Sequence, residues 1–181
     1  ELLTYYKDEH NAILERPQGI LGREAIYVPG YVVDENPIFL MEYWKSFRDP
    51  QVLGLFDSDG TTNISFSDLE VLEFCKYPGV PFSNQNRFYP PQCLPLAWDW
   101  TKEYSPFCKE ILKHNSEYSS TWIEAVITNL GLNFSFVYLG SRMDEIMHQK
   151  FESKRNFLFY NWEPDSTLVR LPSVQLILPP W

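Results

Sequence analysis

The sequence predicts an α/β fold, with a mostly parallel (mixed) sheet flanked by helices. After residue 115, helical and strand patterns alternate, which is typical of strands joined by helices. The chain has 181 residues, of which 44% are hydrophobic and 22% charged, as in an ordered globular protein. This length suits one sizeable core. We therefore expect a single α/β lobe over residues 1–181.

The first third of the chain predicts a mixture of helices and one strand. Apolar residues recur at helical spacing after Pro37, whereas "AIYVPGYVV" is rich in strand-forming residues. Pro29 and Gly30 interrupt that strand, which indicates a bulge or a crossing between lobes. The elements expected are a helix end and linker over 1–17, a strand over 25–33, a helix over 37–50 and a short helix through 56.

The segment "FDSDGTTNISFSDLE" resembles a calcium-binding loop in the spacing of Asp57, Asp59 and Asp68. The glycine required at the sixth position is replaced by Thr62. The bidentate glutamate of the twelfth position is replaced by the shorter Asp68. These departures favour a solvated acidic turn over a metal site, so we expect no metal and keep the three aspartates only as weak calcium candidates.

Residues 75–117 are rich in Cys, Pro, Tyr and Asn, which predicts a loop insertion held by a disulfide, with a helix within 96–114. Cys75, Cys93 and Cys108 are the candidates for one disulfide and one odd thiol. Their spacing contains no CxxC pair, so a zinc site is not expected. Sequons at Asn63 and Asn133 would allow glycosylation. Together these features favour an oxidising, extracellular setting.

The last third of the chain predicts helices and strands in alternation. Thr121 and Glu124 form a capping box at the start of a helix that Gly131 ends. Apolar runs and helical spacing continue this alternation towards the C-terminus. The elements expected are a strand over 134–139, a helix over 142–154, a strand opening at 157 and a last strand over 174–178.

The stretch "FLFYNWEPDS", residues 157–166, ends a strand in an unusual way. Alternation places Tyr160 and Trp162 on one face, and Pro164 prevents continuation inside a sheet. In open α/β sheets ligands bind outside the strand ends, which suggests a binding site. The alternative is that Trp162 fills an edge of the core, as buried aromatics often do.

The formal charge of −9, with no basic cluster, argues against nucleic acid or an anionic membrane surface as a partner. No apolar run approaches the roughly 20 residues of a membrane span. The sequence shows no nucleophile elbow, P-loop or HExxH motif, so we expect neither an enzyme nor a cofactor. Because the chain begins without Met, we expect a mature fragment or an excised domain.

Four stretches occur in an order that resembles the glycine betaine and choline binding proteins of ABC transporters. They are "GREAIYVPGYVVDENP", "FRDPQVLGLFDSDG", "IEAVITNLGLNFSFVYLGS" and "FLFYNWEPDSTLVRLPSVQLILPPW". The likeness is strongest in "NLGLNF", in Tyr160, Trp162 and Pro164, and in the closing "LPPW". It covers roughly residues 18–74 and 115–181. It implies one lobe, the second, of the two-lobed type II periplasmic binding clamshell.

The resemblance implies a site in which aromatic faces hold a quaternary ammonium, which has no hydrogen-bond donor. Trp162 is the expected cage residue. Tyr118 precedes a helix whose first amides, near Ser119 and Ser120, would bind a ligand carboxylate. Further candidate contacts are Tyr160, which is equally suited to the core, Tyr27, and Glu163, which would attract a cation or simply face water.

Two departures from the family pattern leave fewer aromatic residues for the cage. Ile26 stands where relatives often have Trp, and Asp165 and Ser166 follow "WEP" where relatives usually carry His or another aromatic. The function expected is an extracellular or periplasmic lobe for a small quaternary-amine-like ligand, working with a complementary first lobe or a larger parent protein. The alternative is a ligand-silent structural or protein-interaction module that retains the fold.

Overall fold

The computed structural model describes residues 22–58, 60–62, 83–84, 87–94, 107–114 and 122–179. The strands in this part are β1 (Arg23–Pro29), β2 (Ser83–Asn84), β3 (Arg87–Phe88), β4 (Lys109–Lys113), β5 (Phe134–Tyr138), β6 (Leu158–Glu163) and β7 (Ser173–Gln175). The α-helices are α2 (Gly30–Glu35), α3 (Pro50–Gly54), α4 (Trp122–Asn129), α5 (Met143–Glu152) and α6 (Ser166–Arg170). Short 3₁₀ helices cover Pro37–Phe39, Trp44–Arg48, Pro91–Cys93 and Gly140–Arg142. The expected helix end and linker over 1–17 lies outside the described residues.

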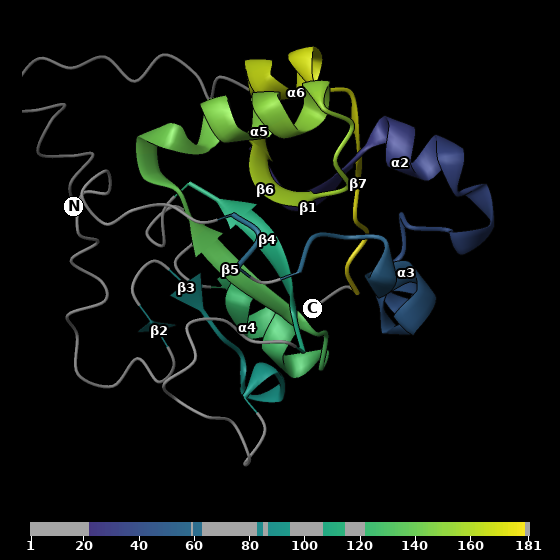
Figure 1. Ribbon diagram of the computed structural model, residues 1–181, viewed down its shortest axis with the longest axis vertical. Coiled ribbons are helices and arrows are strands. Elements are labelled where there is room, and N and C mark those ends of the chain that lie inside the picture. Colours follow the sequence, from purple (N-terminus) through teal and green to yellow (C-terminus); the bar gives the residue numbers. More distant parts are fainter. Residues whose placement is uncertain are drawn as a thin grey trace, which may run out of the picture.

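All of these strands belong to one mixed sheet in the order β2-β3-β5-β4-β6-β1-β7 (Figure 1). β4 pairs in parallel with β5 on one side and with β6 on the other. β1 pairs antiparallel with both β6 and β7, and β3 pairs antiparallel with β5. The α/β class and the mixed sheet with flanking helices are confirmed, but the sheet is partly and not mostly parallel, because the parallel pairing is confined to the central strands β5, β4 and β6.

The helices cover both faces of the sheet. One face packs under α2, α3 and α4 through a core that includes Ile26, Ile111 and Phe136. The other face packs under α5 and α6 through a core that includes Leu112 and Phe159. Neighbouring residues of one strand therefore enter different cores, as expected when both faces of a sheet are buried.

The central strand β4 lies inside the segment expected to be an insertion with a helix over 96–114. Residues 109–113 are instead a strand between β5 and β6, so that expectation was wrong for this part. The disulfide in the segment is present and joins Cys93 to Cys108, with 5.6 Å between their Cα atoms. Cys75 lies outside the described residues.

Two N-terminal elements differ from the expected ones. Pro29 and Gly30 do not bulge the first strand but end it, and α2 begins at Gly30. Proline cannot donate to a further ladder hydrogen bond, which explains the stop. The helix expected over 37–50 is instead two short 3₁₀ helices separated by residues 40–43, and the first of them ends at Leu40, which has a φ of 46°.

The later elements agree well with expectation. α4 is followed by Gly131 at a φ of +62°, a left-handed conformation that glycine adopts without a steric penalty. β6 ends at Glu163, immediately before Pro164. No helix among the described residues is long and apolar enough to cross a bilayer.

Candidate functional site

A pocket of about 460 Å³ lies beside the carboxyl ends of β4 and β6. β4 stops at Lys113, next to the middle of its parallel neighbour, whereas β6 continues to Glu163. This difference in length leaves Trp162 beyond the end of β4, at the kind of crevice where open α/β sheets bind ligands. The lining residues are Glu24, His114, Met143, Asp144, Met147, Tyr160, Asn161, Trp162, Asp165 and Thr167.

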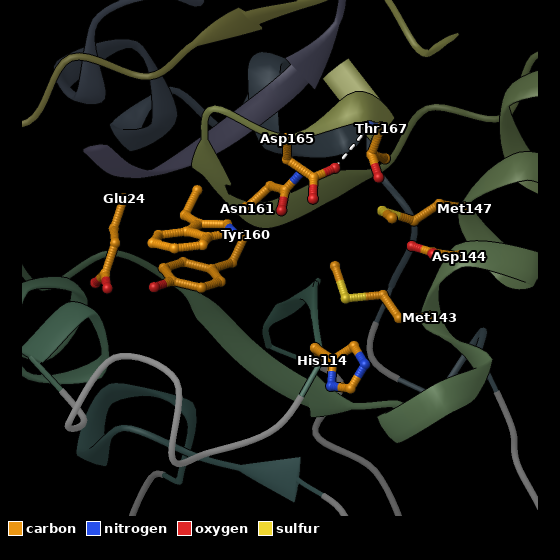
Figure 2. A pocket seen from close by; sticks show the side chains of 10 residues that line it. Glu24, His114, Met143, Asp144, Met147, Tyr160, Asn161, Asp165 and Thr167 are labelled. Carbon is orange, nitrogen blue, oxygen red and sulfur yellow. Dashed lines mark hydrogen bonds between the residues drawn. The ribbon is translucent and has the colours of Figure 1, made fainter. Parts of the chain in front are cut away.

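These residues come from both sides of the sheet end (Figure 2). Glu24 and Tyr160 lie at one side of the pocket, and Met143, Asp144 and Met147 of α5 lie at the other. Thioether and aromatic groups give the pocket polarizable apolar walls. The remaining side chains supply polar atoms, so the arrangement suits a small ligand with an apolar body and a charge.

Trp162 is the large aromatic of this pocket that solvent can reach, with 53% of its surface exposed. In the antiparallel pairing of β1 with β6 it stands directly opposite Glu24. The carboxylate oxygen Oε2 of Glu24 accepts a hydrogen bond of 2.6 Å from the indole Nε1 of Trp122, at the start of α4. Strand register and a helix therefore hold a carboxylate beside an exposed indole ring.

Tyr160 is only 5% exposed, although part of it reaches the pocket wall. The ammonium of Lys113 lies 5.0 Å from its ring centroid, and also 5.7 Å from that of Tyr138 and 5.9 Å from that of Phe136. An internal cation thus already occupies the aromatic surroundings of Tyr160. Tyr160 belongs mainly to the core, which was one of its two expected roles.

Asp165 forms the corner between β6 and α6. Its Oδ1 accepts a 2.6 Å hydrogen bond from the backbone N–H of Thr167, which caps α6. Burial acts to raise the pKa of Asp165, but the hydrogen bond from Thr167, the neighbouring amide of Asn161 and the charge of Arg170 outweigh it and lower that pKa. The charged carboxylate is therefore favoured at this corner of the pocket.

The lining is dominated by negative charge. Glu24, Asp144 and Asp165 are carboxylates, and neither lysine nor arginine occurs among the described residues that line the pocket. Acidic side chains at a pocket wall favour cations over anions as occupants. This preference for cations comes from the side chains that line the pocket and not from the net charge of the whole chain.

Tyr27 and Glu163, both expected as ligand contacts, do not line this pocket. Tyr27 is 2% exposed and stacks on Phe159, and its hydroxyl donates to Glu163. Burial and the Glu163 carboxylate raise the pKa of Tyr27. Hydrogen bonds from Arg23 and Tyr27, with the charge of Arg23, lower the pKa of Glu163 against a smaller effect of burial. The three side chains form a structural network at the sheet surface.

Several other expected site residues lie outside the described part of the chain: Tyr118, Ser119, Ser120, Cys75, Asn63, Asp59 and Asp68. Asn133 is partly buried just before β5, and its glycosylation stays a prediction. Asp57 is not the solvated turn residue expected, because its side chain is 9% exposed. Its carboxylate lies 2.6 Å from both Lys150 and Arg155.

Sequence reasoning found Trp162 and Tyr160 but not Glu24, His114, Asn161 or the α5 residues of the pocket. Met143 and Met147 are four residues apart and so share a helix face. The spacing of Met143 and Met147 can be read from the sequence, but it does not show which part of the fold that helix face contacts. Glu24 gave no local signal, since its position depends on pairing with a strand far along the chain.

Comparison of the sequence with protein-family models finds no matching family, and comparison with curated proteins finds no matching sequence.

Proposed function

We propose that this chain is a solute-binding lobe that takes a small quaternary-ammonium-like cation in the pocket beside Trp162. The observation that carries the proposal is the pairing of an exposed indole with a carboxylate-lined space of ligand size. A trimethylammonium group offers no N–H donor, so aromatic faces and negative charge are what recognise it. The proposed role is binding, without a catalytic step or a cofactor.

The likeness to glycine betaine and choline binding proteins supports this role through Tyr160, Trp162 and Pro164. In the proposal, the pocket faces a complementary lobe supplied by a longer parent polypeptide. One lobe alone encloses a ligand incompletely, so its affinity is expected to be low. The Cys93–Cys108 disulfide is typical of oxidising compartments and supports an extracellular or periplasmic location.

A titration tests the proposal. Choline and glycine betaine are added to the chain up to tens of millimolar while tryptophan fluorescence is followed, with ammonium and glycine as controls. A saturable change is expected with at least one quaternary amine and with neither control. The Trp162→Ala variant should lose it, whereas Trp44→Phe, which removes an indole outside the pocket, should keep it.

A flat response from folded protein would contradict the proposal and favour the alternative, a protein-interaction module. One observation supports that alternative. Ile38, Leu40, Tyr43 and Ile177 expose between 48% and 82% of their surfaces, and Tyr43 and Ile177 form a β-bridge. Clusters of exposed apolar side chains commonly mark contact surfaces.

A further inference from the structure

Glu24 is held in place from two directions. Its backbone is paired with that of Trp162, and its Oε2 accepts the indole N–H of Trp122 at 2.6 Å. Side chains opposite one another in an antiparallel pair lie within contact distance. The carboxylate of Glu24 is therefore a fixed neighbour of the exposed indole ring, and not a mobile surface charge.

Among the residues that the structure describes, the charges near Glu24 do not balance. Lys113 is completely buried and lies 2.5 Å from Glu124 Oε1, so this lysine and this glutamate neutralise each other. Burial lowers the pKa of Lys113, while Glu124 and, at longer range, Glu24 oppose that change. Glu24 is thus a second carboxylate whose charge acts on an ammonium that is already paired with Glu124. In the described part of the chain, Lys113, Glu124 and Glu24 together carry one excess negative charge, and of the three Glu24 lines the pocket.

We propose that Glu24 is the specificity-determining residue of the pocket, and that it selects a cation without a carboxylate, of the size of choline, over a zwitterion such as glycine betaine. This inference rests on the proposed function. A cation against Trp162 supplies the missing positive charge beside Glu24. A zwitterion brings the same cation together with a carboxylate, which must enter a pocket of about 460 Å³ whose walls carry Glu24, Asp144 and Asp165.

The described lining residues offer a ligand carboxylate little compensation. They include no lysine or arginine, and the backbone N–H of Thr167 is engaged by Asp165. The hydroxyl group of choline is not repelled by these carboxylates, because it can donate a hydrogen bond to one of them. Rejection of the zwitterion follows from like-charge repulsion, which is a common device for specificity.

The test compares choline, glycine betaine and tetramethylammonium at constant ionic strength on the full chain. Binding is followed by amide chemical-shift changes and by tryptophan fluorescence. Glu24→Gln removes the charge while its amide oxygen still accepts from Trp122, so folding is expected to persist. Asp34→Asn is the matched control, because Asp34 is exposed on α2 and does not line the pocket.

We expect the unaltered chain to bind choline about tenfold or more tightly than glycine betaine. Glu24→Gln should weaken choline binding by a similar factor and so bring the affinities for choline and glycine betaine close together. Asp34→Asn should leave the ratio of these two affinities unchanged. Equal or tighter betaine binding by the unaltered chain would overturn the inference while leaving the proposed function in place. A ratio unaffected by Glu24→Gln would do the same. Folded protein that binds none of the three ligands would overturn both.

Discussion

The ammonium of Lys113 and the carboxylate of Glu124 form an ion pair of 2.5 Å between β4 and α4, with both side chains almost completely buried. Tyr138 donates a second hydrogen bond, of 2.9 Å, to the same Glu124 oxygen. A strand and a helix are thereby joined by a charge pair inside an otherwise apolar core. Such a pair is costly to break from one side only.

Removing one member of this pair should destabilise the protein strongly. Lys113→Met leaves the Glu124 charge without its partner, and we expect a loss of about 3–5 kcal/mol in the free energy of unfolding. The double variant Lys113→Met with Glu124→Leu should be more stable than the single variant. Chemical denaturation of the four proteins in this cycle measures both effects. Additive losses would contradict direct coupling of the two residues.

The disulfide should make a separate contribution. Cys93 and Cys108 are separated by 15 residues in sequence. A disulfide that closes a loop of this length stabilises the folded protein by roughly 3 kcal/mol. Cys93→Ala with Cys108→Ala is expected to lower the free energy of unfolding by about that amount. Reductant should destabilise the unaltered chain and leave the double variant unchanged. Equal destabilisation of both proteins by reductant would contradict a stabilising role for this disulfide, because the double variant keeps only Cys75.

Acid should remove the contribution of the Asp165 charge. The pKa of Asp165 is below its ordinary value of 3.8 in the folded chain, so its stabilisation is present above about pH 4. This stabilisation is lost as the pH falls through the lowered pKa. Asp165→Asn keeps a capping side chain without the charge. The stability difference between the two proteins should shrink from pH 7 to below pH 3, and a difference that grows on acidification would contradict the assignment.

The turn after α4 should require glycine. Gly131 has a φ of +62°, and a Cβ added there would meet no atom within 4 Å. Gly131→Ala is therefore expected to cost about 1 kcal/mol for conformational reasons alone. Gly54 in α3 has equal space and no positive φ, so Gly54→Ala should be neutral or slightly stabilising. Thermal unfolding compares the two, and equal losses would rule out the backbone explanation.

The elements that sequence predicted well have strong local patterns. β5, which is rich in aromatic and β-branched residues, and α5, with its helical spacing, formed close to their expected ends. β4 was missed because "KEILK" places charged residues at positions that prove to be buried. Glu110 and Lys113 are tolerated there because Arg87, Lys150 and Glu124 supply opposite charges from elsewhere in the chain, and Thr62 donates hydrogen bonds to Glu110.

The site was predictable to a similar degree. The proline after β6 and the run of aromatics indicated that Trp162 would emerge from the sheet. Its neighbours could not be inferred, since Glu24 reaches Trp162 only through the pairing of β1 with β6. Local pattern identifies which residues leave the core, whereas strand order decides which residues they meet.

The pairing of β1 with β6 also has a consequence for how the chain folds. Arg23 and Glu163, at the ends of this pair, are 140 residues apart in sequence. Contacts of such separation form slowly, because a long segment of chain must be ordered before they can stabilise the structure. During synthesis from the N-terminus, Glu24 remains without Trp162 until almost the whole segment has been made. A shortened chain that lacks residues 158–163 would therefore lose Tyr160, Asn161 and Trp162 from the wall of this pocket, however well the remainder folded.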